Sequence, residues 1–182
     1  MRLGIVSDTH GELDNLHKAA KKLIDRWQAD TIVHLGDEWE DVETIKDLPF
    51  KKIIRIPGVY CEQYRDPAIE NRLLMNIEDI RFLFTHTDKV HQNDLPGDPD
   101  PEELAARQMI DVICYGHTHI PDIRQENNVL RLNPGHLKNH DKKGCSPSFA
   151  VVEIQGRKLH LYLIDLETDQ ILREAELHLD QS

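Results

Sequence analysis

Residues 2–37, RLGIVSDTHGELDNLHKAAKKLIDRWQADTIVHLGD, set the fold class of this chain. Residues 2–7 form a short apolar run that ends in polar residues, which is typical of a buried strand. Apolar side chains then recur at spacings of three and four over residues 13–27, which predicts an amphipathic helix. Two more apolar runs follow, at 31–35 and 51–56. Successive strands joined through helices run parallel with right-handed crossovers, so the chain opens as an α/β protein.

The second half of the chain has a different pattern, because its apolar runs come in pairs around short turns. Asn127-Asn128 and Gln155-Gly156 separate two such pairs, as in β-hairpins. We expect short helices over residues 41–46, capped by Asp41, and over residues 102–109. The other expected strands are 72–76, 80–85, 111–115, 123–126, 129–132, 149–154, 158–164 and an edge strand at 171–179. Two sheets packed face to face, with helices outside, would bury both halves of one domain of 182 residues.

The composition narrows the classes of function. A net charge of −11 disfavours binding to nucleic acid or to an anionic membrane. The mean hydropathy is −0.55, and no apolar run approaches the roughly 18 residues of a membrane span. Cys61, Cys114 and Cys145 are odd in number and far apart, and the sequence does not start with an apolar secretory segment. We therefore expect a cytoplasmic protein without disulfides.

Polar residues follow several of the expected strands at the point where each strand ends. Asp8 and His10 follow the first strand, Asp37 follows the second, and His86 follows 80–85. The carboxyl ends of parallel strands meet at one edge of a sheet, where ligands bind in α/β proteins. The residues that could converge there are Asp8, His10, Asp37, His86 and the two histidines of Gly116-His117-Thr118-His119.

Carboxylates and imidazoles together suit divalent metals such as zinc, manganese or iron. Six ligands are too many for one tetrahedral zinc ion and enough for two metals that share a carboxylate. Two metals about 3.5–4 Å apart can clamp the attacking and leaving oxygens of a phosphoryl displacement. Taken singly, Asp8 could instead cap a turn, and Gly36-Asp37 is ordinary turn chemistry. Among the other histidines, His34 is assigned to a strand interior and His91 to solvent.

The order of these motifs resembles that of the calcineurin-like metallophosphoesterases, and the resemblance covers most of the chain. Small single-domain bacterial and archaeal phosphodiesterases are the closest branch, and the small subunit of retromer is similar. The resemblance implies a four-layer α/β/β/α sandwich of two packed mixed sheets flanked by helices. It also implies that a first metal is held by Asp8, His10, Asp37 and His119. Asp37 would bridge to a second metal, which His86 and His117 also hold.

The sequence departs from the family pattern at Pro57-Gly58-Val59-Tyr60-Cys61-Glu62. Val59 stands where the family has an asparagine ligand, and Tyr60 stands where many relatives have a histidine that assists the leaving group. Cys61 or Glu62 could approach the second metal as a substitute ligand, or a water could fill the gap. We expect two divalent metals, manganese first and zinc, iron, nickel or magnesium as alternatives. The second site should be the weaker, because valine cannot coordinate a metal.

Two further positions bear on the site. Asp88, near His86, could orient an imidazole or lie in solvent, and His136 stands where the family has a serine after Asn-Pro-Gly. The proton for the leaving group could come from water, His136 or Tyr60. Loops 59–71 and 91–101 are expected to border the substrate pocket.

The sequence therefore predicts a metal-dependent phosphoesterase, in particular a phosphodiesterase. A metal-bound hydroxide would attack phosphorus, with Asp37, His86 and His117 as the catalytic residues. The alternative is a protein-binding scaffold that keeps the fold with a weakened site, and Val59 is the residue that favours it. The expected partner is a small phosphoester rather than nucleic acid or a membrane, and the sequence leaves homo-oligomers open.

Overall fold

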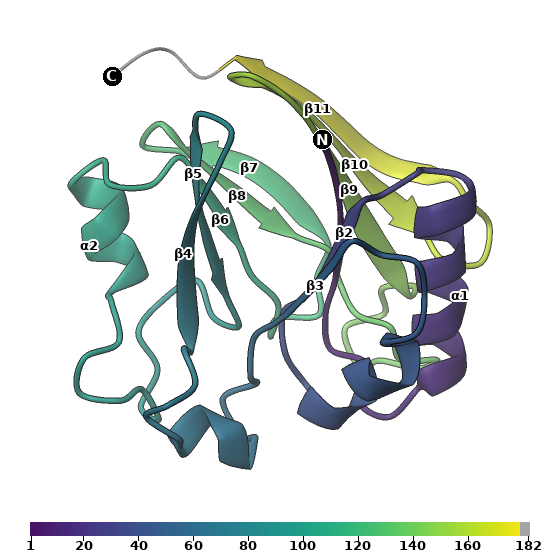
Figure 1. Ribbon diagram of the computed structural model, residues 1–182, viewed down its shortest axis with the longest axis horizontal. Helices are drawn as coiled ribbons and strands as arrows, with labels where there is room; N and C mark the ends of the chain where they lie inside the picture. The colour runs from purple at the N-terminus through teal and green to yellow at the C-terminus, as the bar shows by residue number, and fades with distance from the viewer. Residues whose placement is uncertain (179–182) are drawn as a thin grey trace.

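Strands β1 (Arg2–Val6) and β2 (Thr31–His34) pair in parallel through helix α1 (Leu13–Asp25), as the opening sequence predicts. The computed structural model describes residues 1–178, and Figure 1 shows the arrangement of its elements. The further elements are η1 (Trp39–Ile45), β3 (Lys52–Arg55), η2 (Glu62–Arg65), β4 (Arg72–Ile77), β5 (Ile80–Thr85), α2 (Pro101–Ala106), β6 (Val112–Cys114), β7 (Asp122–Glu126), β8 (Val129–Asn133), β9 (Ser148–Gln155), β10 (Lys158–Asp165) and β11 (Ile171–His178).

The strands form two mixed sheets. The six-stranded sheet has the order β11-β10-β9-β1-β2-β3, in which β1, β2 and β3 are parallel and the later strands are antiparallel. The five-stranded sheet has the order β4-β5-β6-β8-β7, in which β5, β6 and β8 are parallel. Each sheet therefore has a parallel half whose carboxyl ends can share one rim.

The layers follow from where apolar side chains are buried. One core lies between the sheets, with Ile5 and Val33 from one side and Phe82 and Phe84 from the other. Helix α1 packs on the outer face of the six-stranded sheet through residues such as Leu16. Helix α2 covers the outer face of the five-stranded sheet, so the helices flank the two sheets in Figure 1. The predicted four-layer α/β/β/α sandwich is confirmed.

Several element boundaries differ from the predicted ones for local reasons. Asp41 does not cap a helix; it lies inside the 3-10 helix η1, and its carboxylate accepts a hydrogen bond from the backbone N–H of Gly11 at 2.9 Å. Helix α2 starts at Pro101 because the Asp100 side chain accepts hydrogen bonds from the next N–H groups. Strand β11 forms the predicted edge strand, and position 179 of that prediction lies outside the described residues.

The predicted hairpins are present. Asn127 and Asn128 both have left-handed backbone angles between β7 and β8, as a tight hairpin turn requires. The second turn falls one residue later than predicted, because Gln155 still pairs with Lys158 at the end of β9. Among residues 1–178, no helix is long and apolar enough to cross a bilayer.

Candidate metal centre

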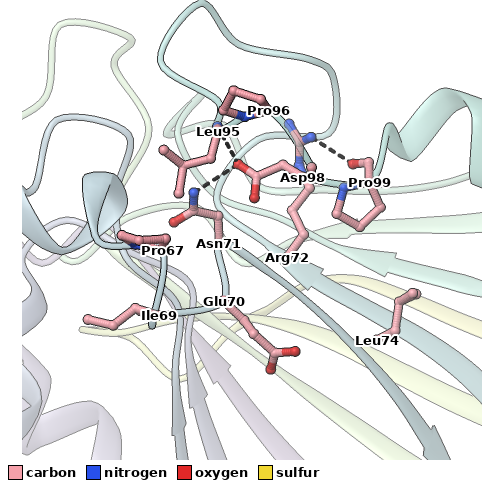
Figure 2. A pocket seen from close by; sticks show the side chains of 11 residues that line it. Pro67, Ile69, Glu70, Asn71, Arg72, Leu74, Leu95, Pro96, Asp98 and Pro99 are labelled. Atoms are coloured by element: carbon pink, nitrogen blue, oxygen red, sulfur yellow. Dashed lines mark hydrogen bonds between the residues drawn. The ribbon is translucent and has the colours of Figure 1, made fainter.

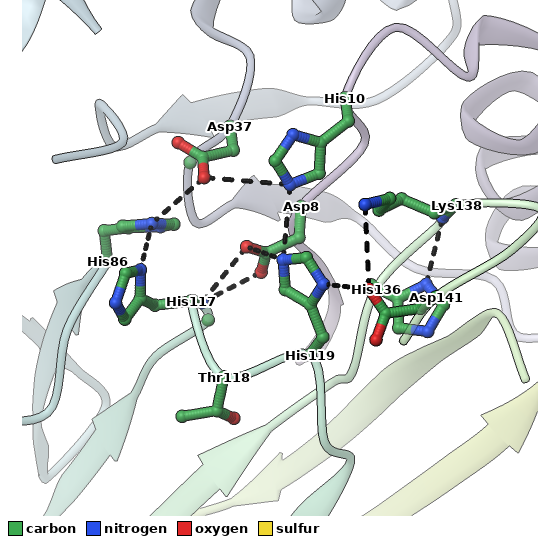
Figure 3. A network of polar contacts seen from close by, with 12 residues as sticks. Asp8, His10, Asp37, His86, His117, Thr118, His119, His136, Lys138 and Asp141 are labelled. Carbon is green, nitrogen blue, oxygen red and sulfur yellow. Dashed lines mark hydrogen bonds and ion pairs between the residues drawn. The ribbon is translucent and has the colours of Figure 1, made fainter. Parts of the chain in front are cut away.

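The six predicted ligands lie together at the rim where the parallel strands of both sheets end (Figure 3). Two compact groups each have their potential ligand atoms within 4.8 Å of one another. We call them the outer group, made of Asp8, His10 and His119, and the inner group, made of Asp8, Asp37 and His86. The sixth residue, His117, places its Nδ1 3.3 Å from Nε2 of His86. The structure therefore brings the sequence-predicted cluster together, while each residue's role as a ligand stays a prediction.

The backbone at the rim is unusual. Five of the six residues have positive φ angles between 44° and 63°, a backbone conformation that residues other than glycine seldom adopt. These residues are Asp8, His10, Asp37, His117 and His119. Such strain concentrates at functional sites, where the surrounding fold holds it in place.

Hydrogen bonds between two loops hold the carboxylates in place. The backbone N–H of Asp8 donates to the carbonyl of Gly36 at 2.8 Å, and that of His10 donates to the carbonyl of Asp37 at 3.2 Å. Below them, the buried His34 accepts from the N–H of Gly36 at 3.3 Å and contacts the hydroxyl of Thr9 at 2.6 Å. Burial lowers the pKa of His34 to about 4, so this histidine is neutral at pH 7.

Asp37 belongs to the inner group and also approaches His10 of the outer group. Its Oδ2 is 3.4 Å from Nε2 of His86 and 3.8 Å from Nε2 of His10. Burial alone would raise the pKa of the Asp37 carboxyl, but the neighbouring imidazoles outweigh burial and hold the pKa below its usual value. A Cβ atom on Gly58 would lie 1.7 Å from Oδ1 of Asp37, so any residue other than glycine at this position would displace the carboxylate.

Two acceptors fix the orientation of two imidazoles. Nδ1 of His86 donates to the backbone carbonyl of Leu35 at 2.7 Å. Nδ1 of His119 contacts Oδ2 of Asp141 at 2.6 Å, and Asp141 is nearly buried. In each case the second nitrogen, Nε2, is turned toward the carboxylates, which is how proteins present histidine to a metal.

Asp141 is a residue that sequence reasoning missed. It lies in an irregular loop after β8, 22 positions from its partner His119, and no local pattern marks it. Burial would raise the pKa of the Asp141 carboxyl, but the hydrogen bond with His119 lowers it well below its usual range. The carboxylate thus stays charged beside the imidazole that it orients.

The donor atoms fit divalent cations. Nε2 of His10 and Nε2 of His119 lie 3.2 Å apart, close to the carboxylate of Asp8. Neutral imidazole nitrogens that face one another repel unless a proton or a cation lies between them. Nitrogen and carboxylate oxygen donors at one place suit zinc, manganese or iron.

The next residues to place are Val59 and the two predicted substitute ligands, Cys61 and Glu62. Val59 is 1% exposed, and its carbonyl accepts a hydrogen bond from the side chain of Asn93 at 2.9 Å. Among the described residues, neither Cys61 nor Glu62 belongs to a group of converging ligand atoms. Burial raises the pKa of the Cys61 thiol, which disfavours the thiolate that a metal needs.

Asp88 and His136 have other partners. The Asp88 carboxylate accepts from Arg124 at 3.0 Å and from Arg131 at 3.4 Å; within residues 1–178 no hydrogen bond joins it to an imidazole. It is therefore neither the orienting residue nor the solvated one that the sequence suggested. His136 is buried, with its ring centroid 5.4 Å from that of His119. Both of its ring nitrogens bond backbone groups, at Cys145 and Lys138.

His91 is not simply in solvent, as the sequence had suggested. It is partly buried, and its ring lies edge-on to His117 with a centroid distance of 5.9 Å. A neighbouring loop brings Tyr60 against this ring, with 5.8 Å between the two ring centroids. Loop residues that cross the rim therefore add to the site, although no strand end marks them.

Comparison with known proteins identifies relatives over most of the chain. Residues 1–157 match the calcineurin-like phosphoesterase superfamily domain. The probable metallophosphoesterase MJ0623 of Methanocaldococcus jannaschii is 32% identical over 139 residues, which are 74% of this chain and 67% of that protein. The phosphodiesterase MJ0936 of the same organism is 31% identical over 149 residues, covering 74% of this chain and 83% of its own.

A solved structure shares the fold. Vacuolar protein sorting 29 from Cryptosporidium parvum superposes with a TM-score of 0.73 over 97% of both chains, at 21% sequence identity. At this identity the likeness concerns the fold alone. The phosphoesterase Yfce from E. coli also superposes, with a TM-score of 0.69 over 99% of this chain and 100% of that chain at 23% identity, so the fold occurs both in a protein named as a phosphoesterase and in one named for sorting.

Proposed function

Because the chain belongs to the calcineurin-like phosphoesterase superfamily, we propose that it is a metal-dependent hydrolase of a small phosphoester, in particular a phosphodiester. The observation that carries this proposal is the position of Asp37. Its Oδ2 lies within 4 Å of an imidazole nitrogen of each group, where a carboxylate could serve two metals at once.

The proposed ligand sets combine the two groups with the bridging position predicted for Asp37, whose Oδ2 lies near both His10 and His86. A first divalent cation would be held by Asp8, His10, Asp37 and His119, and a second by Asp37, His86 and His117. Such a pair of cations lowers the pKa of a water and neutralises charge on the phosphate oxygens during in-line displacement. We propose manganese as the first metal to test, because nitrogen and carboxylate donors accept it.

The leaving group needs a proton, which must come from a residue of the chain or from water. The attacking water would first release a proton to solvent; its oxygen would then bond to phosphorus as the ester bond opposite breaks, and the departing alkoxide would take up a proton. Both ring nitrogens of His136 are hydrogen-bonded to backbone groups. Water or the exposed Tyr60 therefore remains as the proton source. With valine at position 59, a second cation would have one ligand fewer and would be the more weakly held.

A protein-binding scaffold is the alternative function. Two observations favour it: valine at position 59, where the sequence comparison leads us to expect an asparagine ligand, and the fold shared with a vacuolar sorting protein. Metal content separates the two proposals. Protein purified with manganese that holds one metal or none, and that hydrolyses no ester, would support the scaffold.

The remaining proposals concern partners and location. The net charge of −11 disfavours nucleic acid as the substrate, since its phosphates would be repelled over a wide surface. The three cysteines are unpaired, and we propose the reducing cytoplasm as the location. Light scattering would establish whether the chain forms homo-oligomers.

The test is hydrolysis of bis-p-nitrophenyl phosphate with added manganese. We expect turnover that a chelator removes and that Asp37→Ala abolishes. Asp25→Ala is the matched control, because Asp25 is an exposed carboxylate at the end of α1. Absence of turnover in the wild type, or turnover that survives Asp37→Ala, would overturn the proposal.

A further inference from the structure

A row of aromatic rings leads from the metal centre toward solvent. The rings of His86 and His117 lie 5.1 Å apart at their centroids, those of His117 and His91 5.9 Å, and those of His91 and Tyr60 5.8 Å. Each pair meets edge to face, which is a favourable arrangement for aromatic rings. The last ring, Tyr60, is 69% exposed.

Hydrogen bonds tie the two loops that carry these outer rings to one another. The side-chain amide of Asn93 donates to the carbonyl of Val59 at 2.9 Å, so the loop of His91 is bound to the residue before Tyr60. The backbone N–H of Asn93 also donates to Nδ1 of His91 at 3.2 Å. The hydrogen of the neutral His91 ring is therefore on Nε2, which remains a donor.

A buried ion pair anchors the loop of His91 from below. Arg72 has a side chain only 1% exposed, and its guanidinium lies 2.7 Å from Oδ2 of Asp94. The same carboxylate accepts the backbone N–H of His91 at 2.7 Å and, through Oδ1, the hydroxyl of Tyr64 at 2.6 Å. These contacts hold the backbone of His91 at the start of the loop.

The rest of this loop is fixed at the beginning of β4, beside a cavity of about 490 Å³ (Figure 2). The carboxylate of Asp98 accepts the side-chain amide of Asn71 and the backbone N–H of Leu95, both at 2.8 Å. Arg72 donates to the carbonyl of Pro99 at 2.7 Å. Figure 2 shows these contacts: the bond from Leu95 to Asp98 lies within the loop, and the other two join the loop to Asn71 and Arg72 at the beginning of β4.

The position of an exposed ring at the end of this row needs a reason. A single exposed aromatic side chain is common on protein surfaces. Tyr60 differs because it continues a row of rings that starts at the candidate ligands, and because a hydrogen bond joins the two loops of the row while a buried ion pair holds the loop of His91. A surface arranged before binding loses little entropy when a ligand packs against it.

We propose that Tyr60 and His91 form a wall that binds a planar aromatic or heteroaromatic group of the substrate. The substrate class would be phosphoesters whose ring is attached close to phosphorus, since only two ring-to-ring steps separate Tyr60 from His117. The ring would pack on Tyr60, and Nε2–H of His91 would donate to a polar atom of the ligand. This inference rests on the proposed function, because the phosphate must bind at the metal centre.

Two non-hydrolysable phosphonates, one with a flat aromatic ring and one with a saturated ring of the same carbon number, test the wall. We would measure the binding of phenylphosphonate and cyclohexylphosphonate to the manganese-loaded protein by titration calorimetry. The wild type should bind the phenyl compound about tenfold more tightly, the size expected for stacking on one ring. Tyr60→Ala should remove this preference, whereas Tyr60→Phe, which keeps the ring and loses the hydroxyl, should retain it. Met109→Ala is the control, because Met109 is 50% exposed at the opposite end of β6.

The outcomes separate this inference from the proposed function. Equal binding of both phosphonates by the wild type, with hydrolysis intact, would overturn the wall alone. A preference lost in Tyr60→Phe as fully as in Tyr60→Ala would assign the effect to the hydroxyl and also overturn the wall. A wild type that binds neither phosphonate but hydrolyses a diester would overturn the wall alone, whereas a wild type that neither binds a phosphonate nor hydrolyses a diester would overturn the proposed function as well.

Discussion

The outer and inner groups contain the same kinds of side chain, yet the protein supports them differently. A side chain, Asp141, orients His119 in the outer group, whose imidazoles are partly exposed. A backbone carbonyl, that of Leu35, orients His86 in the inner group, whose three members are buried. A support made by a side chain can be lost through one substitution. A support made by the backbone persists as long as the sheet does, so the inner group is the more closely tied to the fold.

The largest expected effect is the difference between substituting His86 of the inner group and substituting His10 of the outer group. The His86 side chain is buried and that of His10 is 31% exposed. His86→Ala should lower turnover about 1000-fold and the free energy of unfolding by about 2 kcal/mol, because Asp37 loses a buried partner. His10→Ala should also impair turnover but change the free energy of unfolding by only about 0.5 kcal/mol. Diester hydrolysis and urea unfolding measure the two effects, and equal losses of stability would contradict the comparison.

The next effect concerns His34, which contacts Thr9 and Gly36 beside the two carboxylates of the centre. His34 has a pKa of about 4 in the folded protein, below the ordinary 6.5, because it is buried. The unfolded chain therefore binds the proton first as pH falls. The stability that neutral His34 contributes is complete above pH 6.5 and is lost progressively toward pH 4, by about 3 kcal/mol in all.

Urea unfolding of the metal-free protein between pH 7.5 and 4 checks this dependence. His34→Gln cannot titrate, so the difference in free energy of unfolding between wild type and variant should shrink as pH falls. A difference that stays constant over this range would show that His34 does not titrate as its burial requires.

A smaller effect tests the side-chain support of the outer group. Asp141→Asn keeps the shape of the residue but removes the charge beside His119. We expect the affinity for one manganese ion to fall about 10–100-fold, as for other residues that orient a metal-binding histidine. Titration calorimetry would resolve the two ions, and Asp25→Asn is the control for removal of an exposed carboxylate. If both affinities fell equally, Asp141 would not serve the outer group in particular.

The smallest effect is a gain at the second metal. Val59→Asn restores the amide oxygen that the family places at this position, and we expect the weaker manganese affinity to rise about tenfold. Val59→Ala is the control, since it makes room without adding a ligand. An unchanged affinity in a folded Val59→Asn protein would mean that this side chain does not face the second metal.

Much of the fold and the cluster could be predicted from local patterns. The alternation of an apolar run, an amphipathic helix and a second apolar run is enough to predict β1, α1 and β2, because each pattern is complete within a few residues. Asp8 and His86 could be placed at one rim, because each follows a strand and parallel strands end on the same side.

Residues in irregular loops could not be placed in this way. Asp141 and His91 lie far in sequence from their partners, and both loops lack a periodic pattern. For Asp88 the sequence suggested a contact with an imidazole, because this residue is close to His86 along the chain. In the structure Asp88 pairs with Arg124 instead. Position along a chain predicts contacts within an element and poorly predicts those between loops.

The amino-acid sequence alone was enough to establish the layered α/β/β/α class and the set of carboxylates and imidazoles at the strand ends. Apolar periodicity and turn chemistry act over short distances, and they leave their mark in consecutive residues. Tertiary packing decided which group orients each imidazole, and it brought Tyr60 and His91 to the edge of the centre. These features depend on where loops from the two sheets cross the rim, and that is settled only when both sheets bury their shared core.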